Sequence, residues 1–400
     1  SGNVIINDSE VSVNTAGQNG GGIFASGNVI INDSEVSVNT AGQDGGGIYV
    51  GGGGRISNSD ITGNEAQTGG GIFNGSVSDL TISASKITEN EAIVRGAGID
   101  NEGTLTLQDV TVARNGKVSG VNDGGGLANG IGATATIENS TFSGNFANNG
   151  GGIDNQGTLT ITNSTIGNNE AALEGGGIRN LRGDVTLKNV TIVGNKVTVT
   201  GGNGGGGINN QVGGTITISN SIVAGNEDLA NGVSKNEVVN QGTFTISGKN
   251  LVGQNGNLGG FPADPSNIVV PGGVIGVQVG PLQNNGGLTE TFALLPGSLA
   301  IDASGAGATT SDQRGVAAVG IRDLGAFESP FSVVSVVGEV LVLTAELGRF
   351  LTQEEERLLF QPYLCVGEVL LAEAPLPELP ACVQSVNVRQ GGELFDLLRN

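Results

Sequence analysis

Histidine, methionine and tryptophan are absent from this chain of 400 residues, and cysteine occurs only at Cys365 and Cys382. Without histidine, the chain lacks the side chain that most often acts as a general base near neutral pH. No apolar run approaches the roughly 18 residues that cross a membrane as a helix. The best candidate, residues 331–345, is interrupted by Glu339. The sequence therefore predicts no membrane span and argues against histidine-dependent catalysis.

The two cysteines bear on the compartment of the protein. In a reducing cytosol they would be two thiols, whereas in an exported protein they would form a disulfide that closes a loop of about 18 residues. The chain starts at Ser1 without methionine or a signal peptide, which suggests a processed or incomplete chain. We expect a secreted protein, extracellular or on the cell surface, with Cys365 and Cys382 as the disulfide candidate.

Basic residues are also scarce. Lys and Arg number 17 against 38 Asp and Glu, which gives a formal net charge of −21. Such a surface repels nucleic acids and anionic membranes, so we expect no nucleic-acid partner. The sequence indicates no cofactor, apart from calcium at acidic surface positions.

Glycine and a repeat dominate what is present. Gly accounts for 73 of the 400 residues, which excludes a helical solenoid. Residues 1–25 return as 26–50 with substitutions at positions 19, 24 and 25 of the unit, and degenerate copies continue to about residue 255. Within a copy, Leu159 and Ile161 alternate with threonines, as in a strand with one buried face. The sequence predicts an all-β fold: a parallel β-helix of about ten coils, stacked about 4.8 Å apart.

Asparagine recurs three residues after an apolar position in every repeat. In a stack of coils such residues lie one above another, and their amides can donate and accept along the column. Asparagine also tolerates the left-handed backbone of a corner. We predict a structural ladder of Asn14, Asn39, Asn64, Asn90, Asn115, Asn145, Asn169, Asn195 and Asn226, with Asn255 as a tenth member. We expect a second ladder at Asn58, Asn139, Asn163, Asn189 and Asn220, with Asp8, Asp33 and Asp109 in the same column.

The periodicity divides the chain into three segments. Residues 1–255 are the repeat body. Residues 256–328 lose the period and introduce proline, which indicates a separate module. Residues 329–400 are predicted to be a β-rich capping or assembly segment that includes one short helix, 354–360.

The repeat pattern, GG-x-I followed by N-x-GT-L-T-I-x-N-S-T-I-x-x-N, resembles the right-handed parallel β-helices of bacterial surface proteins. These include the polymorphic outer-membrane adhesins. Residues 280–328 are similar to the C-terminal module of choice-of-anchor Q proteins, through GPLQNNGG, ALLPGSLAID, SDQRG and DLGAFE. The resemblance implies a right-handed helix, export and cell-surface display, without a known enzymatic activity. Residues 329–400 depart from the short anchor typical of that family.

Many parallel β-helices process acidic polysaccharides, with carboxylates for Ca²⁺ and an Arg or Lys base. Asp100 and Asp154 fall in one column, with Ala128 between them, and Arg179 follows one coil later. These are the best catalytic candidates. The alternative that we favour is a solvated face beside a glycine corner, which assigns no catalytic residue.

Other charged positions have structural and functional interpretations. Glu65 and Glu91 follow ladder asparagines in successive repeats and could share a cation, although a plain charged corner explains them better. Arg314 is expected to pair with Asp302 or Asp312 in a structural role.

Aromatic residues are few, with 12 Phe and 2 Tyr. Phe24, Tyr49 and Phe73 form a column over three coils. Such a column suits sugar binding, but a core or a self-association patch explains it equally well.

The leading hypothesis is an exported structural protein of a cell surface or filament, without enzymatic activity. Its partners would be copies of itself, through head-to-tail or strand-donating contacts between residues 329–400 and the first repeat of the next copy. The alternatives are a polysaccharide lyase or hydrolase, and a glycan-binding adhesin, of the pectate-lyase-like β-helix class.

Overall fold

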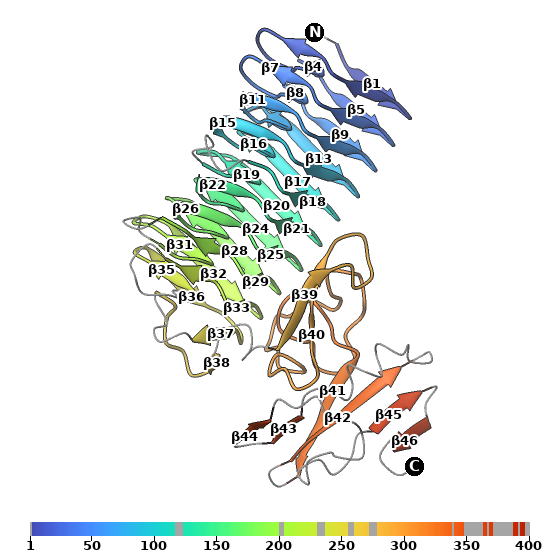
Figure 1. Cartoon of the computed structure of the whole chain (residues 1–400), viewed down its shortest axis with the longest axis vertical. Coiled ribbons are helices and arrows are strands. Elements are labelled where there is room, and N and C mark those ends of the chain that lie inside the picture. Colours follow the sequence, from blue (N-terminus) through green and yellow to red (C-terminus); the bar gives the residue numbers. More distant parts are fainter. Residues whose placement is uncertain are drawn as a thin grey trace.

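The computed structural model describes residues 2–116, 123–199, 204–229, 237–254, 260–271 and 278–337, together with five short strand segments between residues 340 and 396. These residues form a right-handed parallel β-helix of about nine turns, with further β-structure at its C-terminal end (Figure 1). The predicted fold class is confirmed, with about nine turns where ten were expected. The described residues contain no helix, and the predicted helix at 354–360 lies outside them.

Parallel strands stack along the rod and form its faces. Sheet A contains β1 (Val4–Asn7), β5 (Val29–Asn32), β9 (Gly54–Ser57), β13 (Asp79–Ser83), β17 (Thr104–Gln108), β20 (Thr134–Glu138), β24 (Thr158–Thr162), β28 (Asp184–Lys188), β32 (Thr215–Ser219) and β36 (Thr243–Ile246). Sheet B contains β2 (Glu10–Ser12), β6 (Glu35–Ser37), β10 (Asp60–Thr62), β14 (Lys86–Thr88), β18 (Thr111–Ala113), β21 (Thr141–Ser143), β25 (Thr165–Gly167), β29 (Thr191–Val193), β33 (Ile222–Ala224), β37 (Leu251–Gln254) and β38 (Ile268–Pro271).

The remaining strands of the rod lie on its other sides. Sheet C has two parts, β3 (Thr15–Ala16), β7 (Thr40–Ala41), β11 (Glu65–Thr68) and β15 (Glu91–Arg95), then β22 (Phe146–Asn149), β26 (Glu170–Glu174), β30 (Lys196–Val197) and β34 (Glu227–Asp228). Sheet D contains β4 (Ile23–Ala25), β8 (Ile48–Val50), β12 (Ile72–Asn74), β16 (Ile99–Asn101), β19 (Leu127–Asn129), β23 (Ile153–Asn155), β27 (Ile178–Asn180), β31 (Ile208–Asn210) and β35 (Val238–Asn240).

The core is built by alternation within each strand and by stacking between coils. In β24, Leu159 and Ile161 are fully buried while the threonines between and beside them face outward. The parallel register sets Ile161 between Ile137 and Leu187 of the neighbouring coils. Full burial of such a side chain contributes roughly 1.5–3 kcal/mol. A coil can bury these side chains only against its neighbours, so the repeats fold as a stack.

The first predicted asparagine ladder is confirmed. The backbone N–H and Nδ2 of Asn145 both donate to Oδ1 of Asn169, at 3.0 and 2.9 Å. Nδ2 also donates to the backbone oxygen of Val112 at 2.9 Å. The same bonds recur from Asn14 through Asn195 to Asn226. The ladder therefore satisfies amide groups that would otherwise be buried without partners.

The left-handed residue of this corner is not the ladder asparagine itself. It is the residue before it, such as Arg114 with a φ of 54° or Asn168 with a φ of 56°. Tolerance of left-handed backbone therefore does not explain why asparagine recurs in the ladder. The hydrogen bonds between its side-chain amides explain the recurrence.

Glu237 occupies the position of the ladder where Asn255 was expected, and Asn255 lies outside the described residues. The Glu237 side chain is fully buried. Its carboxylate accepts from the backbone N–H of Gly225, and from the N–H and Nδ2 of Asn226, at 2.8, 3.0 and 2.7 Å. Its carboxylate oxygens take the place of the Oδ1 acceptor that the next asparagine would supply, so Glu237 continues the ladder with an acid.

The second predicted column is a left-handed corner. Asn139, Asn163, Asn189 and Asn220 have φ between 46° and 51°, a conformation that asparagine tolerates well. In the later coils their polar groups bond mainly to a distant part of the chain. Oδ1 of Asn189 accepts from the N–H of Thr309, and Oδ1 of Asn163 accepts from the Thr309 hydroxyl.

The structure contains a further asparagine ladder that was not predicted from the sequence. It runs along sheet D and consists of Asn74, Asn101, Asn129, Asn155, Asn180, Asn210 and Asn240, each donating from Nδ2 to Oδ1 of the next at 2.7–2.9 Å. The signal was the residue two places after each GGGI isoleucine. It was hidden because Val50 breaks the column in the best-preserved repeats.

Residues 279–331 form a module against the side of the rod. It contains β39 (Val279–Gln283) and β40 (Thr291–Leu294), which pair antiparallel beside the later coils of sheet B (Figure 1). Phe292, Leu324 and Phe327 share an apolar core with Val193 and Ile222 of the rod. The module is therefore a lateral brace for the last coils.

The strands after the module form a six-stranded sheet at the C-terminal end of the molecule (Figure 1). They are β41 (Phe331–Val337), β42 (Val340–Leu347), β43 (Tyr363–Cys365), β44 (Glu368–Leu370), β45 (Asn387–Gln390) and β46 (Glu393–Asp396). Cys382, half of the disulfide candidate, lies outside the described residues.

Candidate functional site

The three catalytic candidates lie on the outer side of sheet D. The pairing of β16, β19, β23 and β27 sets Asp100, Ala128, Asp154 and Arg179 in one column, as the repeat spacing indicated. The face is not solvated, in contrast to the favoured alternative. Asp100, Asp154 and Arg179 are 0, 1 and 6% exposed.

Arg179 is the centre of a buried ion-pair cluster. Its Nε lies 2.6 Å from Oδ1 of Asp154, an ion pair in which neither atom makes an aligned hydrogen bond. Its Nη1 lies 3.1 Å from Oδ1 of Asp123 and 3.9 Å from Oε2 of Glu174. Asp123 belongs to the coil of Ala128, two coils earlier in the column. The small Ala128 side chain leaves room for the guanidinium to reach that far.

A second pair of contacts holds Asp100. Nε of Arg95 lies 3.1 Å from Oδ2 of Asp100, and Arg95 also forms an ion pair with Glu102. Arg95 and Glu174 were not predicted from the sequence. The signal was a complementary charge five residues before Asp100 and Arg179, on the strand edge before the glycine corner.

Carboxylates outnumber guanidinium groups in this cluster, and burial changes the pKa of two carboxyl groups. Burial raises the pKa of Asp100 to about 7, although the Arg95 charge opposes the change. Burial likewise raises the pKa of Asp154 to about 6, opposed by Arg179 and assisted by the Asp123 carboxylate. Both groups exchange protons near neutral pH, but they do so inside the protein, where a polymer cannot reach them.

The raised pKa values of Asp100 and Asp154 predict that the rod is more stable in mild acid. Each pKa is raised above the unfolded value of 3.8, so folding favours the protonated form. Stability is greatest below the unfolded pKa and falls as the pH rises through the folded values. The cost above pH 7 is on the order of a few kcal/mol per carboxyl.

We expect a melting temperature several degrees higher at pH 5 than at pH 8, measured by circular dichroism at constant ionic strength. Asp100→Asn should flatten the change between pH 4 and pH 7, because the substituted side chain does not titrate. An unchanged slope in this variant would assign the pH dependence to the general surface charge instead.

The structure offers little for calcium. Glu65 and Glu91 pair in register on β11 and β15, as the repeat spacing indicated. However, the described part of the chain contains no group of three or more acidic, cysteine or histidine side chains placed to hold a metal ion. Lys196 pairs with Glu170 at 2.8 Å in the same sheet, which is the behaviour of a charged corner.

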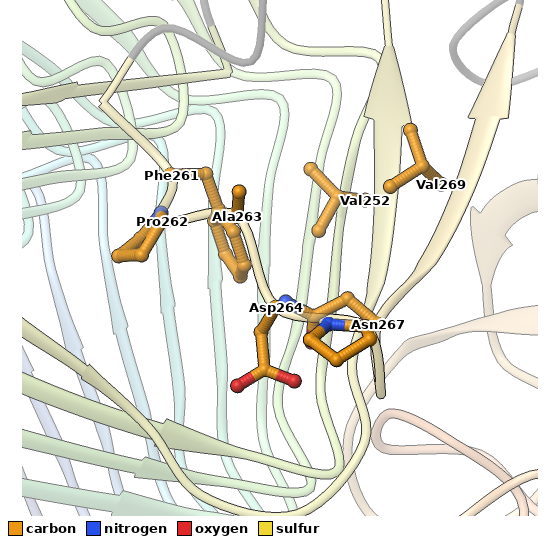
Figure 2. A pocket seen from close by; sticks show the side chains of 8 residues that line it. Val252, Phe261, Pro262, Ala263, Asp264, Asn267 and Val269 are labelled. Atoms are coloured by element: carbon orange, nitrogen blue, oxygen red, sulfur yellow. The ribbon is translucent and has the colours of Figure 1, made fainter.

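One pocket of about 310 Å³ opens at the C-terminal end of the rod (Figure 2). Val252 and Val269, from paired strands β37 and β38, face the segment that carries Phe261 and Pro262. The one carboxylate among the lining residues, Asp264, is occupied by hydrogen bonds from Ser266, which lower its pKa. The pocket therefore holds apolar surface without a reactive group.

The aromatic column is a stack. The ring centroids of Phe24 and Tyr49 are 4.9 Å apart, those of Tyr49 and Phe73 are 5.2 Å apart, and the planes are nearly parallel. Each ring therefore covers the face of its neighbour. Sugars bind to ring faces, so this arrangement offers them mainly ring edges.

Arg314 organises the interior of the module. It pairs with Asp312 at 2.6 Å, one of its two expected partners, and donates to the backbone oxygens of Asn285 and Glu328. Its guanidinium lies 3.7 Å from the centre of the Phe327 ring. These contacts give Arg314 the predicted structural role.

Comparisons with known proteins add little. No family model and no curated protein matches the chain. Among solved structures, the chain is similar to one described as the crystal structure of pectate lyase Pel9A, with 16% identity and a TM-score of 0.41, over 78% of this chain and 88% of that one. The resemblances to choice-of-anchor Q proteins and to outer-membrane adhesins stay predictions. No helix among the described residues is long and apolar enough to cross a membrane.

Proposed function

We propose that the chain is a non-enzymatic structural rod of an exported surface or filament. The observation that carries the proposal is the burial of the best catalytic candidates. Asp100, Asp154 and Arg179 face one another and their ion-pair partners rather than solvent. A lyase needs its base and its cation-binding carboxylates open to the polymer.

We propose that the rod associates with other copies of itself. β1, β2, β3 and β4 are each the last described strand of their sheet, and Val4, Ile6 and Val11 are only partly buried. At the other end of the rod, Phe244 and Ile246 of β36 are likewise only partly buried, while Phe261 is 4% exposed against the core. We propose that strands of residues 329–400 add to the strand edges of the first described coil of another copy.

The structural role predicts an absence of catalysis. We expect no unsaturated or reducing ends when the intact protein is incubated with pectate or alginate, with and without Ca²⁺. Steady release that Arg179→Ala abolishes, in a variant that retains its circular dichroism spectrum, would establish the lyase alternative.

Association is tested at β1, the edge strand of the first described coil. The N–H of Val4 bonds to Asn28 of the next coil, and backbone groups alternate sides along a strand, so the N–H of Ile5 faces outward. Ile5→Pro should remove a pairing group without breaking the rod, since proline is tolerated on edge strands. We expect assemblies of the intact chain by light scattering and electron microscopy, and fewer with Ile5→Pro. A strictly monomeric intact chain at high concentration would refute the association.

A further inference from the structure

The outward side of sheet A carries a regular array of threonines. The central outward residue of each strand from β13 to β36 is threonine, namely Thr81, Thr106, Thr136, Thr160, Thr186, Thr217 and Thr245. A second column, two residues earlier, consists of Asp79, Thr104, Thr134, Thr158, Asp184, Thr215 and Thr243. All these side chains are exposed or half-buried.

The array is a nearly rectangular grid. Pairing from β13 to β36 is parallel and free of register shifts, whereas sheet C shifts in both of its parts. Neighbouring strands lie about 4.8 Å apart, and alternate residues of one strand about 6.7 Å apart. Side-chain ladders keep sheets flat, and two asparagine ladders run along this rod. Hydroxyl and methyl groups therefore repeat in two dimensions over several coils.

Strand propensity alone does not account for the array. Valine, isoleucine and tyrosine suit strands as well as threonine does. The corresponding outward column of sheet B is charged in the early coils, at Glu35, Asp60 and Lys86. Its later threonines, Thr141, Thr165 and Thr191, are buried, and the first two bond to the module, whereas those of sheet A are exposed or half-buried. The threonine block β17–β24 has no charge in either of its columns, on a protein with a net charge of −21.

The chemistry of the face indicates its partner. The two threonine columns are uncharged within β17–β24, with Asp79, Asp184 and Glu138 at their margins. Contact of these columns with an uncharged lattice requires no desolvation of ions. A crystalline polysaccharide would be expected to meet aromatic faces, and no aromatic side chain points outward from β13–β36. The spacings instead approach the oxygen repeats on the prism face of hexagonal ice. Each hydroxyl can donate to and accept from water, while each methyl group is covered by ordered water.

We propose that the threonine face of sheet A binds ice. The first ordered layer of water on the grid would merge with the crystal surface. The proposal is independent of the structural role, because the face lies on the side of the rod and leaves its ends free.

The proposal is tested on the intact chain by ice shaping, thermal hysteresis and inhibition of ice recrystallisation. Thr136→Lys places a long charged side chain at the centre of the grid. We expect its activity to fall about tenfold or more, as when a central contact is lost. Thr88→Lys, outward on sheet B, is the matched control and should retain full activity. Circular dichroism and melting temperature confirm that both variants are folded.

Two results would overturn the proposal. One is a folded intact chain that neither shapes ice nor slows recrystallisation. The other is Thr136→Lys with the activity of the parent or of Thr88→Lys. Equal retention of the parent and of Thr136→Lys on cellulose or chitin would show that any glycan binding uses another face.

Discussion

Replacing Asn145 with leucine should lower the free energy of unfolding by about 3–5 kcal/mol, because it leaves several buried polar groups unpaired. The N–H and Nδ2 of Asn115 lose their shared acceptor, the Asn145 Oδ1. Val112 loses a donor to its backbone oxygen, and Asn169 loses the amide donor to its Oδ1. Leucine has as many side-chain heavy atoms as asparagine and the same branching at Cγ, so the substitution leaves no cavity.

Asn14→Leu is the matched control, since Asn14 stands at the exposed end of the same ladder. It donates to Asn39 but accepts nothing from an earlier described coil. We expect a loss of about 1 kcal/mol there. Urea unfolding followed by circular dichroism gives both values, and hydrogen exchange shows whether the loss is local. If both variants lost the same free energy of unfolding, the bonds that Asn145 accepts from Asn115 would add nothing to stability.

The second large effect is expected in the module. Arg322 and Glu328 are each 3% exposed at the side chain, and Nη1 of Arg322 lies 2.9 Å from Oε2 of Glu328. The same guanidinium donates to the backbone oxygens of Asp323, Gly325 and Phe327. Arg322→Met leaves a buried carboxylate without its charge partner, which costs about 3–5 kcal/mol.

The double variant Arg322→Met/Glu328→Leu separates the causes of this loss. It removes both charges, so we expect it to recover part of the stability. Arg182→Met, at an exposed arginine of the rod, should change little. Limited proteolysis should release the module first in Arg322→Met, while the early coils stay protected. A double variant as unstable as the single one would assign the loss to the backbone hydrogen bonds of Arg322.

Periodicity made the rod predictable from the sequence. A fixed spacing between an apolar residue and Asn145 or its equivalents translates directly into a ladder, because stacked coils repeat every contact. The same logic set Asp100, Asp154 and Arg179 in one column. The ion pairs of that column could not be deduced, since they join it to Arg95 and Asp123 on another part of the coils.

Contacts that do not repeat from coil to coil could not be predicted from the sequence. Glu237 follows Asn226 by a spacing that no other coil uses, so its role as the ladder's acceptor had no precedent in the repeat. The corner of Asn163 and Asn189 looked like a second ladder, because nothing in the repeat shows that Thr309 binds there. Long-range docking of the module replaced the bonds expected between neighbouring coils.

The ladder allows the rod to vary in length. Every ladder asparagine donates in the same direction along the rod, and Glu237 accepts the last of these bonds however many precede it. The nearly identical units 1–25 and 26–50 pair in register through the corresponding strands of each sheet. Gain or loss of such a unit by recombination would change the length in steps of about 4.8 Å. Glu237 and the module of residues 279–331 would remain unchanged, so the length of the rod can vary while its C-terminal end stays the same.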